Sequence, residues 1–388
     1  MHRNLIYSDA IADFRGTVAS PGAILLEGHE IIAAGSPQEI GETDAVPTQV
    51  QGLVIPPLVN VHSHLDLSAI GPQEPTDSFV SWIEHVVAPI RKGLHGDDIS
   101  ATQRGIELSI AGGTSVIGDI ASTVEVAAHV EQSKLTSVSF VEVFGLGDRQ
   151  QNAIDLMQEI PKQYGVSPHA PYSCGREVYV AALNSGRTVA THLSETPREA
   201  DSTMLAKGEL VELAKRVGAW NDAVTPWPNH PLEELTTLFG NEQLIAAHVN
   251  YIEETHLNLL ANSNLTVAYC PRASAYFGHV GHPYKEMLSA GVQVALGTDS
   301  LLCLDTPERI SILDEMRFLY RQGFTDRAML LAMATVHGAD ALGVDSSLLT
   351  LKPGPVLGLL SIKSEEEDAF LGAMRGTDAP QWVRSLKE

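Results

Sequence analysis

A regular alternation of apolar runs and longer helical stretches between residues 53 and 322 constrains the fold of this chain more than any other feature. Short apolar runs bounded by turn residues are typical of buried strands, and amphipathic stretches between them are typical of helices. Eight strands that are each followed by a crossover predict a parallel (β/α)8 barrel. The expected strands are Leu53–Val61, Ser115–Asp119, Ser137–Phe144, Gly165–His169, Thr188–Leu193, Leu244–Val249, Thr266–Cys270 and Val292–Gly297, with helices over Ser78–Lys92, Asp98–Ala111, Asp148–Glu159, Leu232–Phe239 and Pro307–Gln322.

Both ends of the chain differ from this middle part. Residues 1–52 contain short β-like runs between turn residues, and residues 349–362 return to β-like character around a Lys-Pro-Gly-Pro turn. We therefore expect an α/β fold with a catalytic barrel over residues 53–348 and a small β-sandwich formed from residues 1–52 and 349–388. The stretch Glu195–Pro231 is longer than a barrel connection needs, and it is either a lid over the mouth or a decorated loop.

Composition narrows the class of protein. The net charge of −23 is spread along the 388 residues, which argues against nucleic acids and anionic membrane surfaces as partners. Three widely spaced cysteines predict no disulfide framework and fit a reducing compartment. With no apolar stretch that approaches a membrane span, we expect a soluble, cytoplasmic protein that acts on a small molecule, and a homodimer is compatible with the sequence.

Polar side chains with metal-binding chemistry follow several of the predicted strands. His62 and His64 come at the end of the first, and residues two apart on an extended chain point to the same side. The carboxyl ends of barrel strands meet at one mouth, so residues at other strand ends should join them. Three imidazoles and one carboxylate suit Zn²⁺ or Fe²⁺ with an open position for water. The further candidates are His192 and Glu195 after strand five, His248 after strand six and Asp299 after strand eight.

Each of these residues also has a simpler explanation. Asp299 could cap the helical segment that follows it, His248 could hydrogen-bond its own loop, and Glu195 could be solvated. We favour one shared site because all of them fall at the ends of the same set of strands.

The motifs around these residues resemble those of the amidohydrolase superfamily, in particular its deaminase and chlorohydrolase branch, over nearly the whole chain. Pro57 departs from the pattern, since these enzymes usually have glycine there. The resemblance implies a distorted TIM (β/α)8 barrel with a β-sandwich from both termini. The motifs are Val59-Asn-Val-His-Ser-His-Leu65, Thr191-His-Leu-Ser-Glu195, Ala247-His-Val-Asn250, Cys270-Pro-Arg272, Leu296-Gly-Thr-Asp-Ser300 and His337-Gly-Ala-Asp-Ala-Leu-Gly343.

The same resemblance implies the chemistry of the site. It implies one divalent metal, with Zn²⁺ expected and Fe²⁺ as the alternative, held by His62, His64, His192 and Asp299. His248 and Asp299 would orient an activated water molecule and accept its proton. Glu195 would protonate a ring nitrogen beside the attacked carbon, so that an aromatic amine leaves as ammonia.

Within this branch, the run Tyr276-Phe-Gly-His279 looks like the group related to aminodeoxyfutalosine deaminases of menaquinone biosynthesis. An aromatic pair and a histidine beside the mouth could stack on a purine and bond a ribose or a carboxylate. Arg272 is either a carboxylate clamp or a structural ion pair. The expected substrate-binding residues are His169, Arg272, Tyr276, Phe277, His279 and Trp82.

Other activities stay open at this point. Alternative substrates are methylthioadenosine, S-adenosylhomocysteine, 5′-deoxyadenosine, guanine and cytosine, and the branch also hydrolyses C–Cl and C–N bonds of triazines. A metal-binding protein without activity is a different class of function, and the complete set of ligands, base and acid argues against it.

Overall fold

Eight parallel strands form the central sheet of the structure, a computed structural model that describes residues 3–384. Their order in the sheet follows their order in the chain. The expected barrel is confirmed, and the strands from the second onward begin and end within two residues of their predicted limits. They are β8 (Leu58–Ser63), β9 (Thr114–Ala121), β10 (Thr136–Val143), β11 (Gly165–Pro168), β12 (Val189–Leu193), β13 (Leu244–His248), β14 (Leu265–Tyr269) and β15 (Gln293–Leu296).

The sheet curls round until its two edges meet at the residues predicted to bind metal. The backbone N–H groups of Thr298 and Asp299 both donate to the carbonyl of His62, at 3.0 Å each. Ser63 and Asp299 also form an isolated parallel β-bridge. Gly297 permits this approach, because a Cβ there would lie 2.9 Å from the Cβ of His62. Closure of the barrel therefore brings the ends of β8 and β15 together.

The first apolar run is two strands rather than the single strand expected. Leu53–Ile55 forms β7, which pairs with strands of a small sheet, and only β8 belongs to the barrel. Pro56 and Pro57 separate them. Proline has no N–H to donate, so a continuous ladder cannot pass through these two positions.

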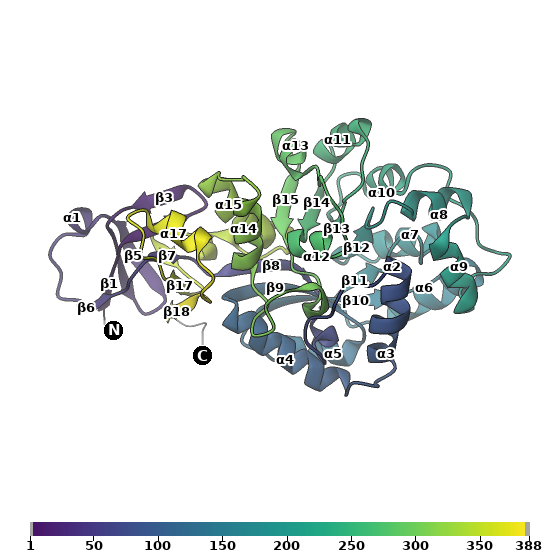
Figure 1. The fold of residues 1–388 in the computed structure, drawn as a ribbon, viewed down its shortest axis with the longest axis horizontal. Helices are drawn as coiled ribbons and strands as arrows, with labels where there is room; N and C mark the ends of the chain where they lie inside the picture. The colour runs from purple at the N-terminus through teal and green to yellow at the C-terminus, as the bar shows by residue number, and fades with distance from the viewer. Residues whose placement is uncertain (1–2, 385–388) are drawn as a thin grey trace.

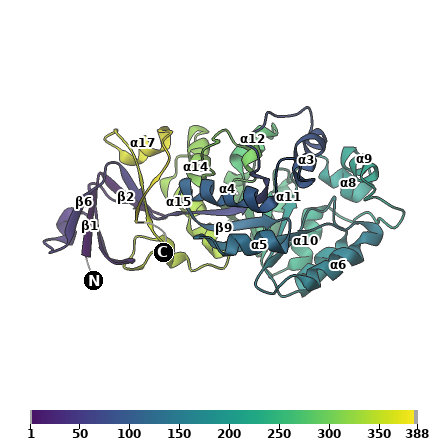
Figure 2. The same ribbon diagram turned by 90° about the horizontal axis from the view of Figure 1, so that it is seen from below.

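Two five-stranded sheets from the chain ends lie beside the barrel, with β1 and β18 at the same end of the molecule (Figures 1 and 2). Both sheets contribute to one apolar core, in which Ile24 and Ile31 of one sheet meet Ile11, Val54 and Leu359 of the other. The strands are β1 (Arg3–Ser8), β4 (Gly22–Glu27), β5 (Glu30–Gly35), β6 (Val46–Gln49) and β16 (Gly354–Pro355) in one sheet, and β2 (Ala10–Asp13), β3 (Gly16–Ala19), β7, β17 (Leu359–Ile362) and β18 (Gln381–Arg384) in the other.

The sheets formed by both chain ends are confirmed. The division of the chain after residues 52 and 348 stays a prediction, and residues 1, 2 and 385–388 of the expected sandwich lie outside the described residues.

Helices cover the outside of the barrel (Figure 1). Within the sheet, Leu244 and Ala246 belong to one apolar cluster while Ile245 and Ala247 belong to another, so alternate residues of β13 face different partners. The helices are α1 (Pro37–Ile40), α2 (Phe79–Trp82), α3 (Ala88–Arg91), α4 (Asp98–Ala111), α5 (Val124–Glu131), α6 (Gln150–Glu159), α7 (Arg176–Asn184), α8 (Glu199–Leu205), α9 (Glu209–Arg216), α10 (Pro231–Phe239), α11 (Glu254–Ala261), α12 (Pro271–Tyr276), α13 (Tyr284–Ser289), α14 (Ile312–Arg321), α15 (Arg327–Ala334), α16 (Val336–Ala341) and α17 (Ala369–Arg375).

Local sequence explains several helix limits. Asp97 caps α4 by accepting from the N–H of Ser100 at 2.9 Å, and Gly112 follows its last residue. A π-helical turn over Ile83–Val87 joins α2 to α3. The helix expected from Pro307 begins only at Ile312, because Ser311 is extended and caps it. Within residues 3–384, no helix has the length and apolar character needed to cross a membrane.

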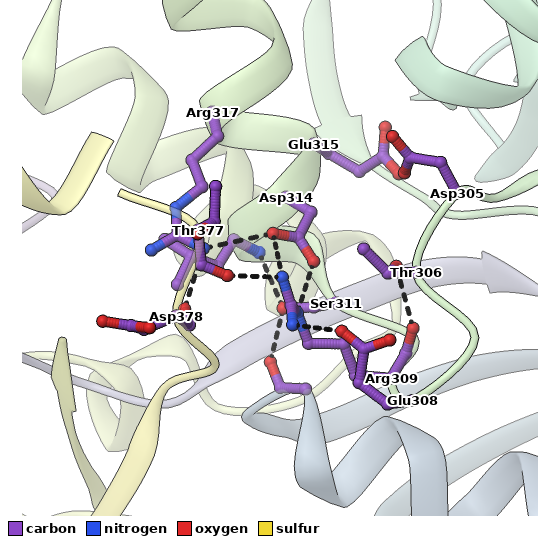
Figure 3. Close-up of polar contacts among 12 residues, drawn as sticks. Asp305, Thr306, Glu308, Arg309, Ser311, Asp314, Glu315, Arg317, Thr377 and Asp378 are labelled. Atoms are coloured by element: carbon purple, nitrogen blue, oxygen red, sulfur yellow. Dashed lines mark hydrogen bonds and ion pairs between the residues drawn. The ribbon is translucent and has the colours of Figure 1, made fainter. Parts of the chain in front are cut away.

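Buried arginines attach the C-terminal segment to α14 (Figure 3). Arg317 is 1% exposed and donates to the carbonyls of Ala373 and Asp378 at 3.0 and 2.8 Å. Arg309 pairs with Asp314 at 2.7 Å and donates to the carbonyl of Thr377. Each buried guanidinium therefore uses its donors to hold the backbone of the segment that contains Ala373, Thr377 and Asp378.

We predict that Arg317→Ala lowers the free energy of unfolding by about 3 kcal/mol, because it leaves the buried Asp314 and the carbonyls of Ala373 and Asp378 with fewer donors. Urea unfolding of purified protein measures this change. Arg321→Ala is the matched control, since Arg321 is exposed on the same helix and should change stability by less than about 0.5 kcal/mol. Equal effects of the two substitutions would contradict the assignment.

Candidate active site

Four histidines and one aspartate converge where the barrel closes. The rings of His62, His64, His192 and His248 lie with centroids between 4.9 and 5.6 Å apart in five of their pairs. The Nε2 atoms of His64 and His192 are 3.2 Å apart, and Oδ1 of Asp299 is 3.6 Å from Nε2 of His64. Potential ligand atoms lie within 4.8 Å of one another in two overlapping groups, His62–His192–His248 and His62–His64–Asp299.

The electrostatics of this cluster suit a cation. Burial holds the pKa values of His62, His64 and His248 well below their usual range and lowers that of His192 to about 4. Neutral imidazoles have lone pairs to offer a metal. Among the described residues, buried Nε2 atoms of His62 and His248 have no hydrogen-bond partner. A set of imidazole nitrogens and a carboxylate fits Zn²⁺ or Fe²⁺.

Backbone carbonyls lie within hydrogen-bonding distance of two histidine rings at the site, those of His192 and His282. The carbonyl of His169 accepts from the N–H of His192 at 2.8 Å and lies 2.9 Å from its Nδ1, which leaves Nε2 facing the cluster. His282 lies with Nε2 2.7 Å from the carbonyl of His248. The sequence predicted His169 only as a substrate contact, and it did not single out His282.

Three of the strand ends that carry these residues have left-handed backbone. Ser194, His248 and Asp299 have φ values of 49°, 71° and 59°. Non-glycine residues rarely adopt this conformation, and where they do the surrounding structure has to stabilise it. The turns send the chain away from the barrel at the site.

Glu195 lies beside the histidines rather than in solvent. It is 6% exposed, its Oε1 is 3.5 Å from Nε2 of His248, and its Oε2 accepts from the hydroxyl of Tyr172 at 3.2 Å. Burial, followed by the charges of Asp299 and Glu199, raises the pKa of Glu195 well above its usual range. A protonated carboxyl in this position can act as an acid.

The turn that carries Glu195 is held by residues to which the sequence analysis gave no role. Glu199, which is buried, accepts from the N–H groups of Ser194 and Glu195 at 2.8 and 3.0 Å. Asn250 donates from Nδ2 to the carbonyl of Glu195 at 3.0 Å. In the sequence, the acidic residue Glu199 four positions after Glu195 was a signal for the contact with the backbone of Ser194 and Glu195. Asn250 was already part of the motif Ala247-His-Val-Asn250.

A cavity of about 690 Å³ opens from this cluster, within the range of about 300–1,000 Å³ that is usual for small-molecule sites. His64, His169, Glu195 and Asp299 lie at its polar end. Trp82 lines it as expected.

The long connection after β12 builds one wall of this cavity. Its helix α9 contributes Leu210, Leu213 and Ala214, and it packs on the helix that carries Phe79. Arg216 pairs with Glu84 at 2.9 Å across this contact. The connection is therefore ordered and belongs to the site, while its motion as a lid stays a prediction.

Four of the expected substrate-binding residues are not among those that line the cavity. Arg272 is buried against Glu315 at 2.6 Å and Asp305 at 2.9 Å, which is the structural ion pair considered above. Phe277 packs edge-on against Trp82, with ring centroids 5.0 Å apart. Tyr276 donates to the carbonyl of Glu74, and Nδ1 of His279 lies 2.7 Å from the hydroxyl of Tyr251. Within the run 276–279, Phe277 therefore packs against a side chain that lines the cavity.

Comparison with known proteins adds an independent line of evidence. The sequence pattern described as the amidohydrolase family matches residues 53–356. The chain is 28% identical over 372 residues to the 5-methylthioadenosine/S-adenosylhomocysteine deaminase of Pyrococcus furiosus, covering 89% of this chain and 82% of that protein. It is 25% identical over 342 residues to the aminodeoxyfutalosine deaminase of Deinococcus radiodurans, covering 81% and 79%.

The fold has a close counterpart among solved structures. Helicobacter pylori aminofutalosine deaminase, in a crystal structure with methylthio-coformycin, superposes with a TM-score of 0.80. The match covers 98% of both chains at 17% sequence identity. At that identity the likeness establishes the fold.

We predict that His192→Ala removes most of the bound divalent metal, because its Nε2 points into the centre of the ligand cluster. Elemental analysis of the purified protein gives the metal content per chain. His85→Ala is the control, since His85 is exposed and should leave the content unchanged. Full metal retention in His192→Ala would refute this ligand.

Proposed function

Because the chain belongs to the amidohydrolase family and is thereby a hydrolytic enzyme acting on carbon–nitrogen bonds, we propose that it is a metal-dependent deaminase of 5′-substituted adenine nucleosides, with aminodeoxyfutalosine as the preferred substrate. The observation that carries this proposal is the buried Glu195 beside the histidine cluster, at the polar end of a nucleoside-sized cavity. The relatives are named as deaminases of methylthioadenosine, S-adenosylhomocysteine and aminodeoxyfutalosine, and these names support the proposal.

The chain's own residues account for the proton transfers of the reaction. Hydrolytic deamination adds water to the amine-bearing carbon and releases ammonia. Burial raises the pKa of Glu195 and favours its protonated form, which donates to the ring nitrogen beside that carbon, and the hydroxyl of Tyr172 donates a hydrogen bond that orients the carboxyl group. His248 and Asp299 face the same point and accept the protons that water loses. A divalent cation held by His62, His64, His192 and Asp299, Zn²⁺ or Fe²⁺, would supply Lewis acidity that makes water nucleophilic near neutral pH.

The lining of the cavity favours a particular 5′ substituent. It includes the apolar side chains of Leu146, Leu156, Leu210 and Leu213 together with the exposed cation Arg149. An aromatic carboxylate, the group at the far end of aminodeoxyfutalosine, matches an apolar wall with one cation. Arg149 takes the role of carboxylate partner that the sequence suggested for Arg272.

Methylthioadenosine is the second candidate substrate. Its methylthio group is small and uncharged, so it would cover part of the apolar wall and leave Arg149 without a partner. The greater identity to the Pyrococcus furiosus deaminase favours it. Triazine hydrolysis and deamination of free bases would leave most of the cavity unfilled.

We predict that Glu195→Gln keeps its metal but lowers kcat by about 10²–10⁴-fold, because an amide cannot donate the proton that ring protonation requires. Ammonia release and the ultraviolet change from adenine to hypoxanthine measure turnover, and elemental analysis measures metal. Glu209→Gln, at an exposed position of α9, is the control and should keep full activity. Unchanged turnover in Glu195→Gln would remove the acid role.

We predict that Arg149→Gln lowers kcat/KM for aminodeoxyfutalosine by about tenfold and leaves that for methylthioadenosine little changed, because only the first substrate carries a carboxylate. A panel assay on zinc-loaded protein, which also includes S-adenosylhomocysteine, adenosine, guanine and cytosine, gives both values. Arg198→Gln is the control, because Arg198 is exposed and does not line the cavity. Equal losses on both nucleosides would argue against aminodeoxyfutalosine.

A further inference from the structure

Two polar side chains of the cavity wall have no role in the chemistry above. Glu142 is the second-last residue of strand β10. It is 8% exposed and lines the cavity. Ser122 follows β9 and lines it too. Within residues 3–384, the buried Oε1 of Glu142 and Oγ of Ser122 have no hydrogen-bond partner. Buried polar atoms without partners are uncommon and call for a ligand that supplies them.

These two side chains are neighbours in the sheet. Ala121 of β9 is paired with Val141 of β10, so the next residues, Ser122 and Glu142, lie next to each other at the carboxyl ends of the strands. Side chains in register on adjacent parallel strands point to the same side. A carboxyl group and a hydroxyl group therefore face one region of the cavity.

The nearby cation Arg91 does not neutralise Glu142 by direct contact. Its Nη1 donates to Oδ2 of the buried Asp66 at 2.5 Å. The N–H of Ser122 donates to the same oxygen at 3.1 Å. Asp66 thus positions both neighbours of Glu142 while the carboxyl group itself stays available to a ligand.

The location of Glu142 fits the middle of a nucleoside. Potential ligand atoms of Glu142, His169 and His192 lie within 4.8 Å of one another, so the carboxyl group is close to the polar end where deamination occurs. The helix α9 contributes apolar side chains to the same cavity. In a 5′-substituted nucleoside, the sugar lies between the base and the substituent.

Resting on the proposed function, we propose that Glu142 and Ser122 bind the vicinal hydroxyl groups of the substrate's ribose. Glu142 accepts hydrogen bonds from the 2′- and 3′-hydroxyls, and Ser122 makes a further one to the same pair. A site that hydrogen-bonds two substrate hydroxyls rejects an analogue without them, because its buried polar atoms are then left without partners, so this pair selects ribonucleosides over deoxynucleosides.

The same carboxyl group could instead belong to a second cation site with His169 and His192. The contacts of these histidines disfavour it. Nδ1 of His169 lies 2.6 Å from Oγ of Ser173, and Nδ1 of His192 lies 2.9 Å from the carbonyl of His169. His192 has only Nε2 left, which faces His64.

The test compares ribose with its deoxy forms in wild-type protein and in Glu142→Gln and Ser122→Ala. Metal-loaded enzyme is assayed with adenosine, 2′-deoxyadenosine, 3′-deoxyadenosine and 2′,3′-dideoxyadenosine. We expect Glu142→Gln to lower the ratio of kcat/KM for adenosine over the dideoxy analogue by about ten- to a hundred-fold. Ser122→Ala should lower it less, since it removes a neutral partner.

A binding measurement separates this role from catalysis and from folding. Titration calorimetry with inosine and with 2′,3′-dideoxyinosine should show that wild-type protein prefers inosine and that Glu142→Gln loses this preference. Ser139→Ala is the matched control, because Ser139 is a buried serine of β10 whose side chain does not line the cavity. It should keep the wild-type ratio.

Three outcomes would overturn the proposal. Equal losses with adenosine and the dideoxy analogue would show that Glu142 does not bind the diol. A fall from two metal ions per chain to one in Glu142→Gln would assign Glu142 to a second cation. Wild-type deamination of both nucleosides with equal kcat/KM would remove the diol site alone, whereas no deamination of any adenine nucleoside would overturn the proposed function as well.

Discussion

The structure depends on one electrostatic constraint, the burial of several lone-pair donors at the closure of the barrel. His62, His64, His192 and His248 are neutral and closely packed, and Asp299 joins them from the last strand. Such a set is unfavourable without a cation, because its members offer one another few donors. The backbone bonds that close the barrel, from Thr298 and Asp299 to His62, lie at the same point. The contacts that close the barrel therefore also bring the residues of the candidate site together.

From this centre the cavity divides into regions of different chemistry. Strands β8, β12, β13 and β15 supply the ligand cluster, and the turn after β12 supplies Glu195. The ends of β9 and β10 supply the polar pair Ser122 and Glu142, and the connection after β12 supplies an apolar wall. This combination of a ligand cluster, a polar pair and apolar side chains supports the proposal of a 5′-substituted nucleoside as substrate.

Much of this arrangement could be predicted from the sequence. Strand limits were predicted closely because strands of a parallel sheet are buried on both faces and read as continuous apolar runs. His62, His64, His192, His248 and Asp299 could be identified because each comes directly after such a run, and Glu195 because it follows His192. The apolar run from Leu53 was misread as one strand, although two adjacent prolines marked the break. Arg272, Tyr276, Phe277 and His279 were expected at the substrate, and that role stays a prediction, because none of them is among the residues that line the cavity.

The sequence by itself determined the class of fold and predicted which residue types the candidate site contains, because both follow from local order, apolar periodicity and the residue at each strand end. Only the tertiary structure decided which polar side chains face the cavity. The sequence suggested Arg272 as a carboxylate partner, yet its guanidinium is paired with the buried Glu315, whereas the exposed Arg149, to which the sequence analysis gave no role, lines the cavity. Glu142 and Ser122 are 20 residues apart in the chain and become neighbours only through the register of β9 and β10. Pairing of this kind depends on long-range contacts, which no local pattern specifies.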